Sequence, residues 1–243
     1  MNTNGRRNTK WTVVVCLAAL GLAGCGSDGT SSAVVAGPEM PSVAGTVIAP
    51  DGEFARLTPP WQWADALTLV GRADALQGVA GVSTPQTVSL SRLDPVAAGH
   101  GCAPQRPCLQ LITSTRTDSA GRFQISHGAL GDLNADHLIL HVGDEPLLTR
   151  AFVFSRTADI NASSEAVVRL VLLRLTQAPP VQLNVFTNDA LQTLADLADV
   201  LTAHLSATGS DVASFNEKVY DTLAVSGTMH KTMDELTSGA AAQ

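Results

Sequence analysis

Between residues 42 and 154 the sequence is a succession of short β-prone runs, each bounded by turn residues. The runs span residues 42–49, 86–93, 109–117, 121–126, 137–142 and 147–154. No long helical period interrupts them, and strands at this spacing are typical of an all-β sandwich. Because aromatic residues make up only 4% of the chain, we expect a core built from Val, Leu, Ile and Ala.

After Ser155 the pattern becomes helical. The run SSEAVVRLVLLRL, residues 163–175, is ambiguous because its β-branched residues favour a strand. Glu165 and Arg169, however, form an i,i+4 pair in the order that stabilises a helix, and Ser163 or Ser164 can cap it. We therefore predict a helix here.

Further helices are predicted in the C-terminal part. Residues 188–207 should form a helix with Asn188 as its cap and Gly209 as its stop. Ser210 is expected to cap the next helix, and a last short helix should follow. The residues expected to face the core are Leu191, Leu194, Ala198, Leu201 and Leu205, then Val212, Phe215 and Val219, then Met229, Met233 and Leu236.

The segment TRTDSAGRFQI, residues 115–125, is the most informative internal stretch. Asp118 can accept a hydrogen bond from the backbone two residues on, and Gly121 can take a positive φ, which predicts a tight turn. Phe123 and Ile125 then alternate with polar residues, as in a half-buried strand.

This turn and three earlier motifs resemble the carboxypeptidase regulatory-like domain. The earlier motifs are Gly45-Thr46-Val47, Asp51-Gly52 and Val88-Ser89-Leu90. The resemblance implies an α+β chain, in which an antiparallel prealbumin-like (transthyretin-like) seven-stranded β-sandwich over residues 41–158 is followed by a helical C-terminal region, residues 159–243. A long insert at about residues 53–81 departs from the family pattern. The family implies no catalytic residues.

The N-terminal residues indicate that the protein is exported. A basic head precedes an apolar run, Trp11–Gly24, that is too short to cross a bilayer and fits a signal peptide, residues 1–24. The run ends in Leu22-Ala23-Gly24-Cys25, which resembles the bacterial lipobox. The resemblance implies that Cys25 is acylated and becomes the first residue of the mature protein. Residues 25–40 would then be a flexible tether, and Gly26 indicates the outer membrane by resemblance to enteric sorting.

Charge excludes one class of partner. The chain carries a formal net charge of −7, and the part after the signal peptide is more acidic still, which argues against nucleic acid. The expected partners are the membrane, through the N-terminal lipid anchor, and an envelope protein or glycan.

Cys102 and Cys108 enclose the residues APQRP. An exported protein meets an oxidising compartment, so a disulfide is the leading interpretation. A zinc pair is the alternative, although the spacing is long and no second cysteine pair exists.

His137 and His141 share one face of a predicted strand and could hold a metal, but surface histidines are the preferred interpretation. Asp132, Asn134 and Asp136 have a calcium-like spacing, yet His137 and Gly143 occupy the positions that require Gly and Glu. We therefore expect no metal and no cofactor.

No common catalytic motif is present in the sequence. The predicted role is therefore structural or binding and not enzymatic. Alternatives are a carbohydrate-binding module that uses Trp61 and Trp63, a hydrolase or metal enzyme around His137 and His141, and a subunit of a larger assembly. The preferred interpretation of the two tryptophans is that they pin the insert onto the sandwich.

Overall fold

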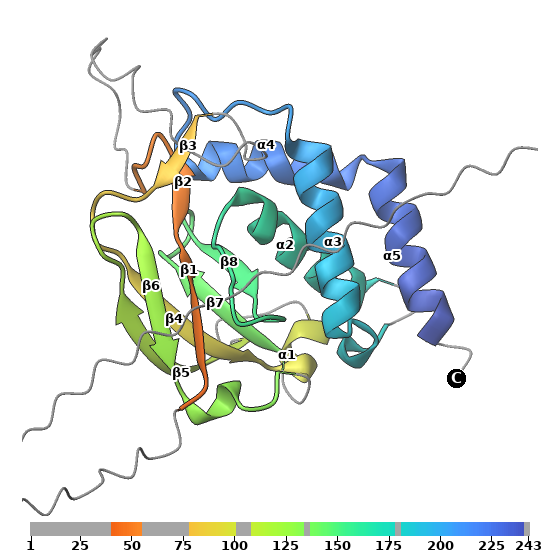
Figure 1. Cartoon of the computed structure of the whole chain (residues 1–243). Helices are drawn as coiled ribbons and strands as arrows, with labels where there is room; N and C mark the ends of the chain where they lie inside the picture. Colours follow the sequence, from red (N-terminus) through yellow and green to blue (C-terminus); the bar gives the residue numbers. More distant parts are fainter. Residues whose placement is uncertain (1–39, 55–77, 101–107, 134–136, 178–180, 241–243) are drawn as a thin grey trace, which may run out of the picture. The chain divides into compact units, whose positions relative to one another are not determined.

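The computed structural model describes residues 40–54, 78–100, 108–133, 137–177 and 181–240, all within one unit, Glu39–Gln243. The predicted α+β class with antiparallel sheets is confirmed. Strands fill the first part of the described chain, and helices fill the part after residue 161 (Figure 1). No helix in these described ranges is long and apolar enough to cross a membrane.

Eight strands are described, in three antiparallel sheets. They are β1 (Ser42–Thr46), β2 (Ile48–Pro50), β3 (Val79–Gly81), β4 (Thr87–Leu93), β5 (Leu109–Arg116), β6 (Arg122–Ser126), β7 (Leu138–Val142) and β8 (Thr149–Phe152). One sheet pairs β1 with β6, another pairs β2 with β3, and the largest has the order β5-β4-β7-β8. Every run predicted as a strand contains one, but the expected count of seven is not reproduced, because β3 was missed and the first run divides at Val47.

The predicted turn before β6 is confirmed. The Asp118 carboxylate accepts hydrogen bonds from the backbone N–H groups of Ala120 (2.8 Å) and Arg122 (2.9 Å), and Gly121 has a φ of 75°. Phe123 and Ile125 are buried, while Arg122 and Gln124 are exposed. Strand β6 therefore presents one apolar face to the core.

The largest sheet is covered on both faces. Along β7, Leu138 and Leu140 pack into one apolar core with β1 and β6, whereas Ile139 between them packs into a second core with the helices. A bulge between Leu90 and Ser91 of β4 interrupts its pairing with β5. Leu90 thus belongs to the first core and Leu93 to the second.

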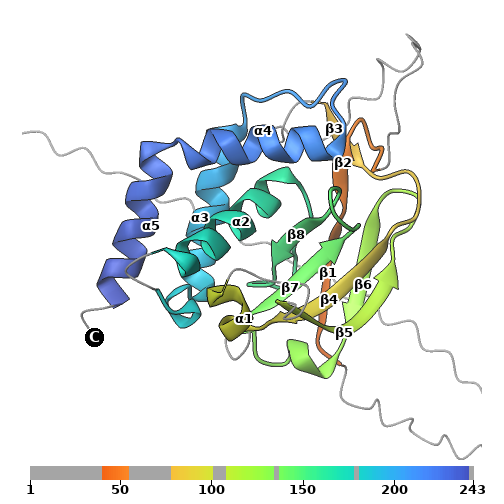
Figure 2. The same cartoon turned by 180° about the vertical axis from the view of Figure 1, so that it is seen from behind.

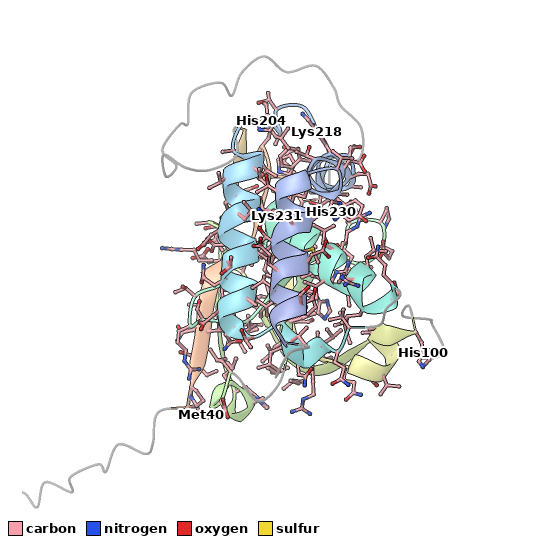
Figure 3. The ribbon with its side chains drawn as sticks, turned by 90° about the vertical axis from the view of Figure 1, so that its right-hand side faces the viewer. Met40, His100, His204, Lys218, His230 and Lys231 are labelled. Atoms are coloured by element: carbon pink, nitrogen blue, oxygen red, sulfur yellow. The ribbon has the colours of Figure 1, made fainter. Side chains whose placement is uncertain are left out.

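The described helices are α1 (Pro95–Gly99), α2 (Ala162–Thr176), α3 (Asn188–Thr202), α4 (Val212–Ala224) and α5 (Gly227–Ala240), with short 3₁₀ turns η1 (Gly128–Leu130) and η2 (Leu183–Val185). Helix α2 packs on β8 and is flanked by α3 and α4, as Figures 1 and 2 show from opposite sides. Figure 3 looks onto α3 and α5, which lie side by side.

The predicted helix over residues 163–175 is confirmed as α2, but its predicted ion pair is wrong. Glu165 pairs with Arg150 of β8, with the Arg150 Nη2 and Glu165 Oε1 atoms 2.6 Å apart. Arg169 pairs instead with Glu217 of α4 (2.7 Å) and stacks on the Tyr220 ring. Packing against β8 and α4 gives both side chains partners outside their own helix.

Several predicted helix caps differ by one to three residues. The N-cap of α2 is Asn161, which forms a capping box with Ser164. Thr187, not Asn188, caps α3, and Asp211, not Ser210, caps α4. In each case a side-chain oxygen accepts a hydrogen bond from the third residue on, and that geometry decides the cap.

The predicted apolar stripes face the core. Leu191, Leu194 and Ala198 of α3 are buried, as are Val212, Phe215 and Val219 of α4 and Met229 and Met233 of α5. Leu201 and Leu236 are only partly buried and pack at the edge of the core. Leu201 lies near the C-terminal end of α3, where it faces the core as predicted but is covered only in part.

Two further segments differ from prediction. Residues 95–99 form α1, which was not among the predicted helices, and β3 lies inside the expected insert at residues 53–81. The rest of that insert, residues 55–77, lies outside the described residues.

Candidate binding site: an apolar cavity beside α1, η2 and α3

A cavity of about 670 Å³ lies beside the end of β4, the start of β7 and the end of β8. Its other walls come from α1, the end of α2, η2 and the start of α3. Its wall is mainly apolar. Its apolar side chains include Leu93, Val96, Leu138, Phe152, Phe186 and Leu191. A cavity of this size and lining is typical of small-molecule sites.

Local sequence signals build one side of the cavity. Asp94 caps α1 by accepting hydrogen bonds from the N–H groups of Val96 (2.9 Å) and Ala97 (3.0 Å). Pro95 follows as the first helical residue, where its missing N–H costs nothing. Ala97 and Ala98 are buried, whereas Val96 is 60% exposed. Helix α1 therefore packs against the core through Ala97 and Ala98, while Val96 stays exposed and lines the cavity.

The opposite side comes from the connection between α2 and α3. Turn η2 places Phe186 in the core at 0% exposure. His137 Nε2 lies 3.0 Å from the Phe186 carbonyl oxygen. Because a carbonyl can only accept, His137 donates through Nε2. This bond joins the start of β7 to the start of α3 across the cavity wall.

The polar lining is basic or neutral. Arg92, His100, His137, Gln182, Asn184, Thr187 and Asn188 contribute to it. Within the described ranges no Asp or Glu lines the cavity. Arg92 and His100 are exposed, and His100 lies at the end of α1 (Figure 3). The cavity therefore combines a permanent positive charge at its mouth with an apolar interior.

A second polar cluster lies between the sheet and α2. Glu165 is 3% exposed and accepts hydrogen bonds from the Arg150 backbone N–H (2.8 Å), Nε (3.0 Å) and Nη2 (2.6 Å). Burial raises the pKa of Glu165 above its ordinary value, although the bonds from Arg150 oppose this shift. The cluster fixes α2 against β8, since every one of these bonds crosses that interface.

His141 belongs to this second cluster. Its Nε2 lies 3.1 Å from the Ser91 hydroxyl, and burial lowers the pKa of His141, assisted by the charge of Arg150 and opposed by Asp144. A Ser–His contact at this distance has the geometry of a nucleophile and its base. Ser91, however, is 0% exposed and does not line the cavity, so in this conformation no substrate can reach its hydroxyl.

The structure separates the two histidines. His137 lines the cavity, while His141 contacts Ser91, and both are partly buried. Their interpretation as surface histidines is therefore wrong. Each fills a hydrogen-bonding role at a boundary between sheet and helices, which a strand pattern alone does not reveal.

The other predicted site residues have mixed outcomes. Cys25, Cys102, Trp61 and Trp63 lie outside the described residues. Cys108 is buried at 6% exposure directly before β5, and its pairing with Cys102 stays a prediction. Among the described residues no group of three or more His, Cys, Asp or Glu side chains is placed to hold a metal ion.

Some functional residues were missed by sequence reasoning. The Asp94-Pro95 pair is a helix-start signal and could have identified α1. Glu165 and Arg150 are 15 residues apart on a helix and a strand, so no local pattern joins them.

In the comparisons with known proteins, no protein-family model, no curated protein and no solved structure matches the chain.

Proposed function

We propose that this chain is a lipid-anchored protein of the bacterial envelope, held at the outer membrane through Cys25, with a non-catalytic binding role. The cavity of about 670 Å³ beside α1 and α3 carries the binding part of the proposal. The sequence Leu22-Ala23-Gly24-Cys25, after a basic head and an apolar run, carries the anchoring part.

The proposal includes a specific sandwich architecture. We take β1 and β2 as one bent first strand and residues 156–160 as the last strand, because Ala44 bridges Thr157 and Val47 bridges Ile160. One layer would then contain β6, β1 and residues 156–160, opposite the sheet β5-β4-β7-β8. This is a seven-stranded arrangement of the prealbumin-like kind, with β3 as an addition and with helices on the outer face of the larger sheet.

The anchor is tested by a matched pair of cysteine variants. Cys25→Ala should abolish acylation and release the protein from the detergent phase or leave its signal uncut. Cys16→Ala should leave both unchanged, because Cys16 departs with the signal peptide. Mass spectrometry of the mature N-terminal peptide reports both results, and a wild-type peptide that starts elsewhere or lacks acyl mass would refute the anchor.

A disulfide between Cys102 and Cys108 is part of the same proposal, since export brings the chain into an oxidising compartment. It would close a short loop in the connection from α1 to β5.

A further inference from the structure

We infer that the cavity beside α1 and α3 binds an anionic amphiphile, a carboxylate that carries an unbranched alkyl chain. This inference rests on the binding part of the proposed function and names its ligand class. It does not depend on the anchor at Cys25.

The interior of the cavity selects an apolar body. Leu93, Leu138, Phe186 and Leu191 each have an exposed fraction of 2% or less and still contribute to the wall. The apolar side chains of the lining that a ligand can reach are those of Val96, Leu133 and Val181, which are exposed or half-buried. Each methylene group transferred from water to such surroundings raises affinity up to about fourfold, so affinity should increase with chain length until the cavity is filled.

The size of the cavity agrees with this ligand class. About 670 Å³ lies within the range of roughly 300–1,000 Å³ that holds small organic ligands. The lining is too apolar for a ligand made mostly of hydroxyl groups, because each unpaired hydroxyl would lose its hydrogen bonds to water.

The mouth of the cavity selects the charge of the head. Arg92 lies there with its side chain exposed, and no described lining residue is acidic. Arg92 makes another interaction in the structure, but a guanidinium has five N–H donors and can bind a carboxylate in addition. On a chain with a net charge of −7, a mouth with this lining favours an anion locally.

The apolar wall and the positive mouth belong to one cavity. Val96, which is 60% exposed, lines it together with buried residues such as Leu93. A single ligand can therefore bury its chain and keep its carboxylate at Arg92 and in contact with water. A cation is disfavoured at the same place by the charge of Arg92.

The test measures dodecanoate binding to the full chain as it is purified, held in amphipol without free detergent, by isothermal titration or by NMR of the ¹³C-labelled acid, with the amphipol alone as the blank. Dodecanoate should bind at one site, and decanoate should bind there several-fold more weakly. Dodecanol should bind at least about tenfold more weakly than dodecanoate, because the alcohol lacks the charge-assisted contact.

Two pairs of variants locate the site. Val96→Trp fills the cavity mouth from an exposed position and should abolish binding. Val225→Trp, at a residue that is 82% exposed, follows α4 directly and does not line the cavity, should not. Arg92→Gln should weaken dodecanoate binding about tenfold and dodecanol binding by less than about twofold. Arg116→Gln, which removes an exposed charge from β5, should change neither.

The outcomes are distinct. Equal affinities for dodecanoate and dodecanol, or an Arg92→Gln effect that is the same for both, would overturn the anionic head. Absence of binding, or binding that Val96→Trp leaves intact, would overturn the site. Neither result alters the acyl mass on Cys25, so failure of this inference is separable from failure of the anchor.

Discussion

Glu165 is a carboxylate placed between a helix and a sheet, where its charge is balanced by one neighbour. Its side chain is 4% exposed and that of Arg150 is 15% exposed. Removing one partner of a buried ion pair leaves the other charge uncompensated, which is much more costly than losing a surface pair.

Glu165→Gln should therefore lower the free energy of unfolding by about 3–5 kcal/mol. The matched control is Glu217→Gln, since Glu217 pairs with Arg169 at 2.7 Å but is 56% exposed, and its loss should cost less than about 1 kcal/mol. Urea titration of both variants measures the difference. Equal midpoints would show that the Arg150 pair is not what fixes α2.

His141 gives the fold a pH dependence whose sign follows from its burial. The pKa of His141 is lowered from 6.5 in the folded state, so the unfolded chain binds the proton more readily. The stability that this residue contributes is fully present above about pH 6.5 and is lost as pH falls toward the lower folded-state pKa.

His141→Gln should therefore make the free energy of unfolding less dependent on pH between about pH 7 and about pH 5.5. The comparison must be with the wild type, because Glu165 and Asp199, whose pKa values burial raises, contribute with the opposite sign at lower pH. His204→Gln changes an exposed histidine after α3 (Figure 3) and is the control for replacing a histidine outside the cluster. An unchanged slope in His141→Gln would contradict the assignment.

Among the elements, the turn before β6 depends on a glycine in two ways. Gly121 has a φ of 75°, and a Cβ atom added there would lie 2.6 Å from the Val82 nitrogen and 2.7 Å from the Val47 oxygen. Gly209 has nearly the same φ, 74°, but nothing within 4 Å of its added Cβ. The two positions separate backbone strain from steric conflict.

Gly209→Ala should cost about 1–2 kcal/mol, the strain of a left-handed residue alone. Gly121→Ala should cost more than about 3 kcal/mol, because the backbone at Val47, between β1 and β2, and at Val82, after β3, must also move. Thermal or urea unfolding of the two variants gives the comparison. Similar losses would mean that the turn relaxes without disturbing Val47 and Val82.

A comparison of the elements shows which of them could be predicted from the sequence. The strands and the stripe of α3 could be predicted because each has one buried face, which imposes a period of 2 or 3.6 on the apolar residues. Helix α2 is buried on several sides, and its buried residues include Ala166, Val168 and Val171. Its apolar residues therefore show only a weak helical period, which is why the sequence was also compatible with a strand.

The cavity was less predictable than the fold. Its lining residues come from seven separate elements, and the bond between His137 and the Phe186 carbonyl joins residues 49 positions apart. Only the Asp94-Pro95 pair, which marks the start of α1, indicates a part of it in the sequence. A site assembled by tertiary packing leaves no local spacing in the sequence.

For the whole molecule, the sheet β5-β4-β7-β8 is the shared wall of both cores. Leu93, Ile139 and Phe152 face the helices, whereas Leu90, Leu140 and Ala151 face the smaller sheets. A sheet covered on both faces cannot lose one cover without exposing an apolar surface.

A chain that ends at Ile160 should therefore fail to form a cooperatively folded sandwich, although it retains every described strand. We expect it to bind a hydrophobic dye strongly and to lack a sharp thermal transition. A sharp transition and a well-dispersed NMR spectrum would show that the strands are independent of the helices.

The bridges of Ala44 to Thr157 and of Val47 to Ile160 bear on the order in which the chain can fold. Strand β1 emerges early in synthesis, yet its two neighbours, β6 and residues 156–160, follow it by about 80 and 113 positions. Bringing such distant segments together requires closure of long loops before any contact is gained. The hairpin-like neighbours β7 and β8 can pair at once, so the first strand to be made is among the last to be completed.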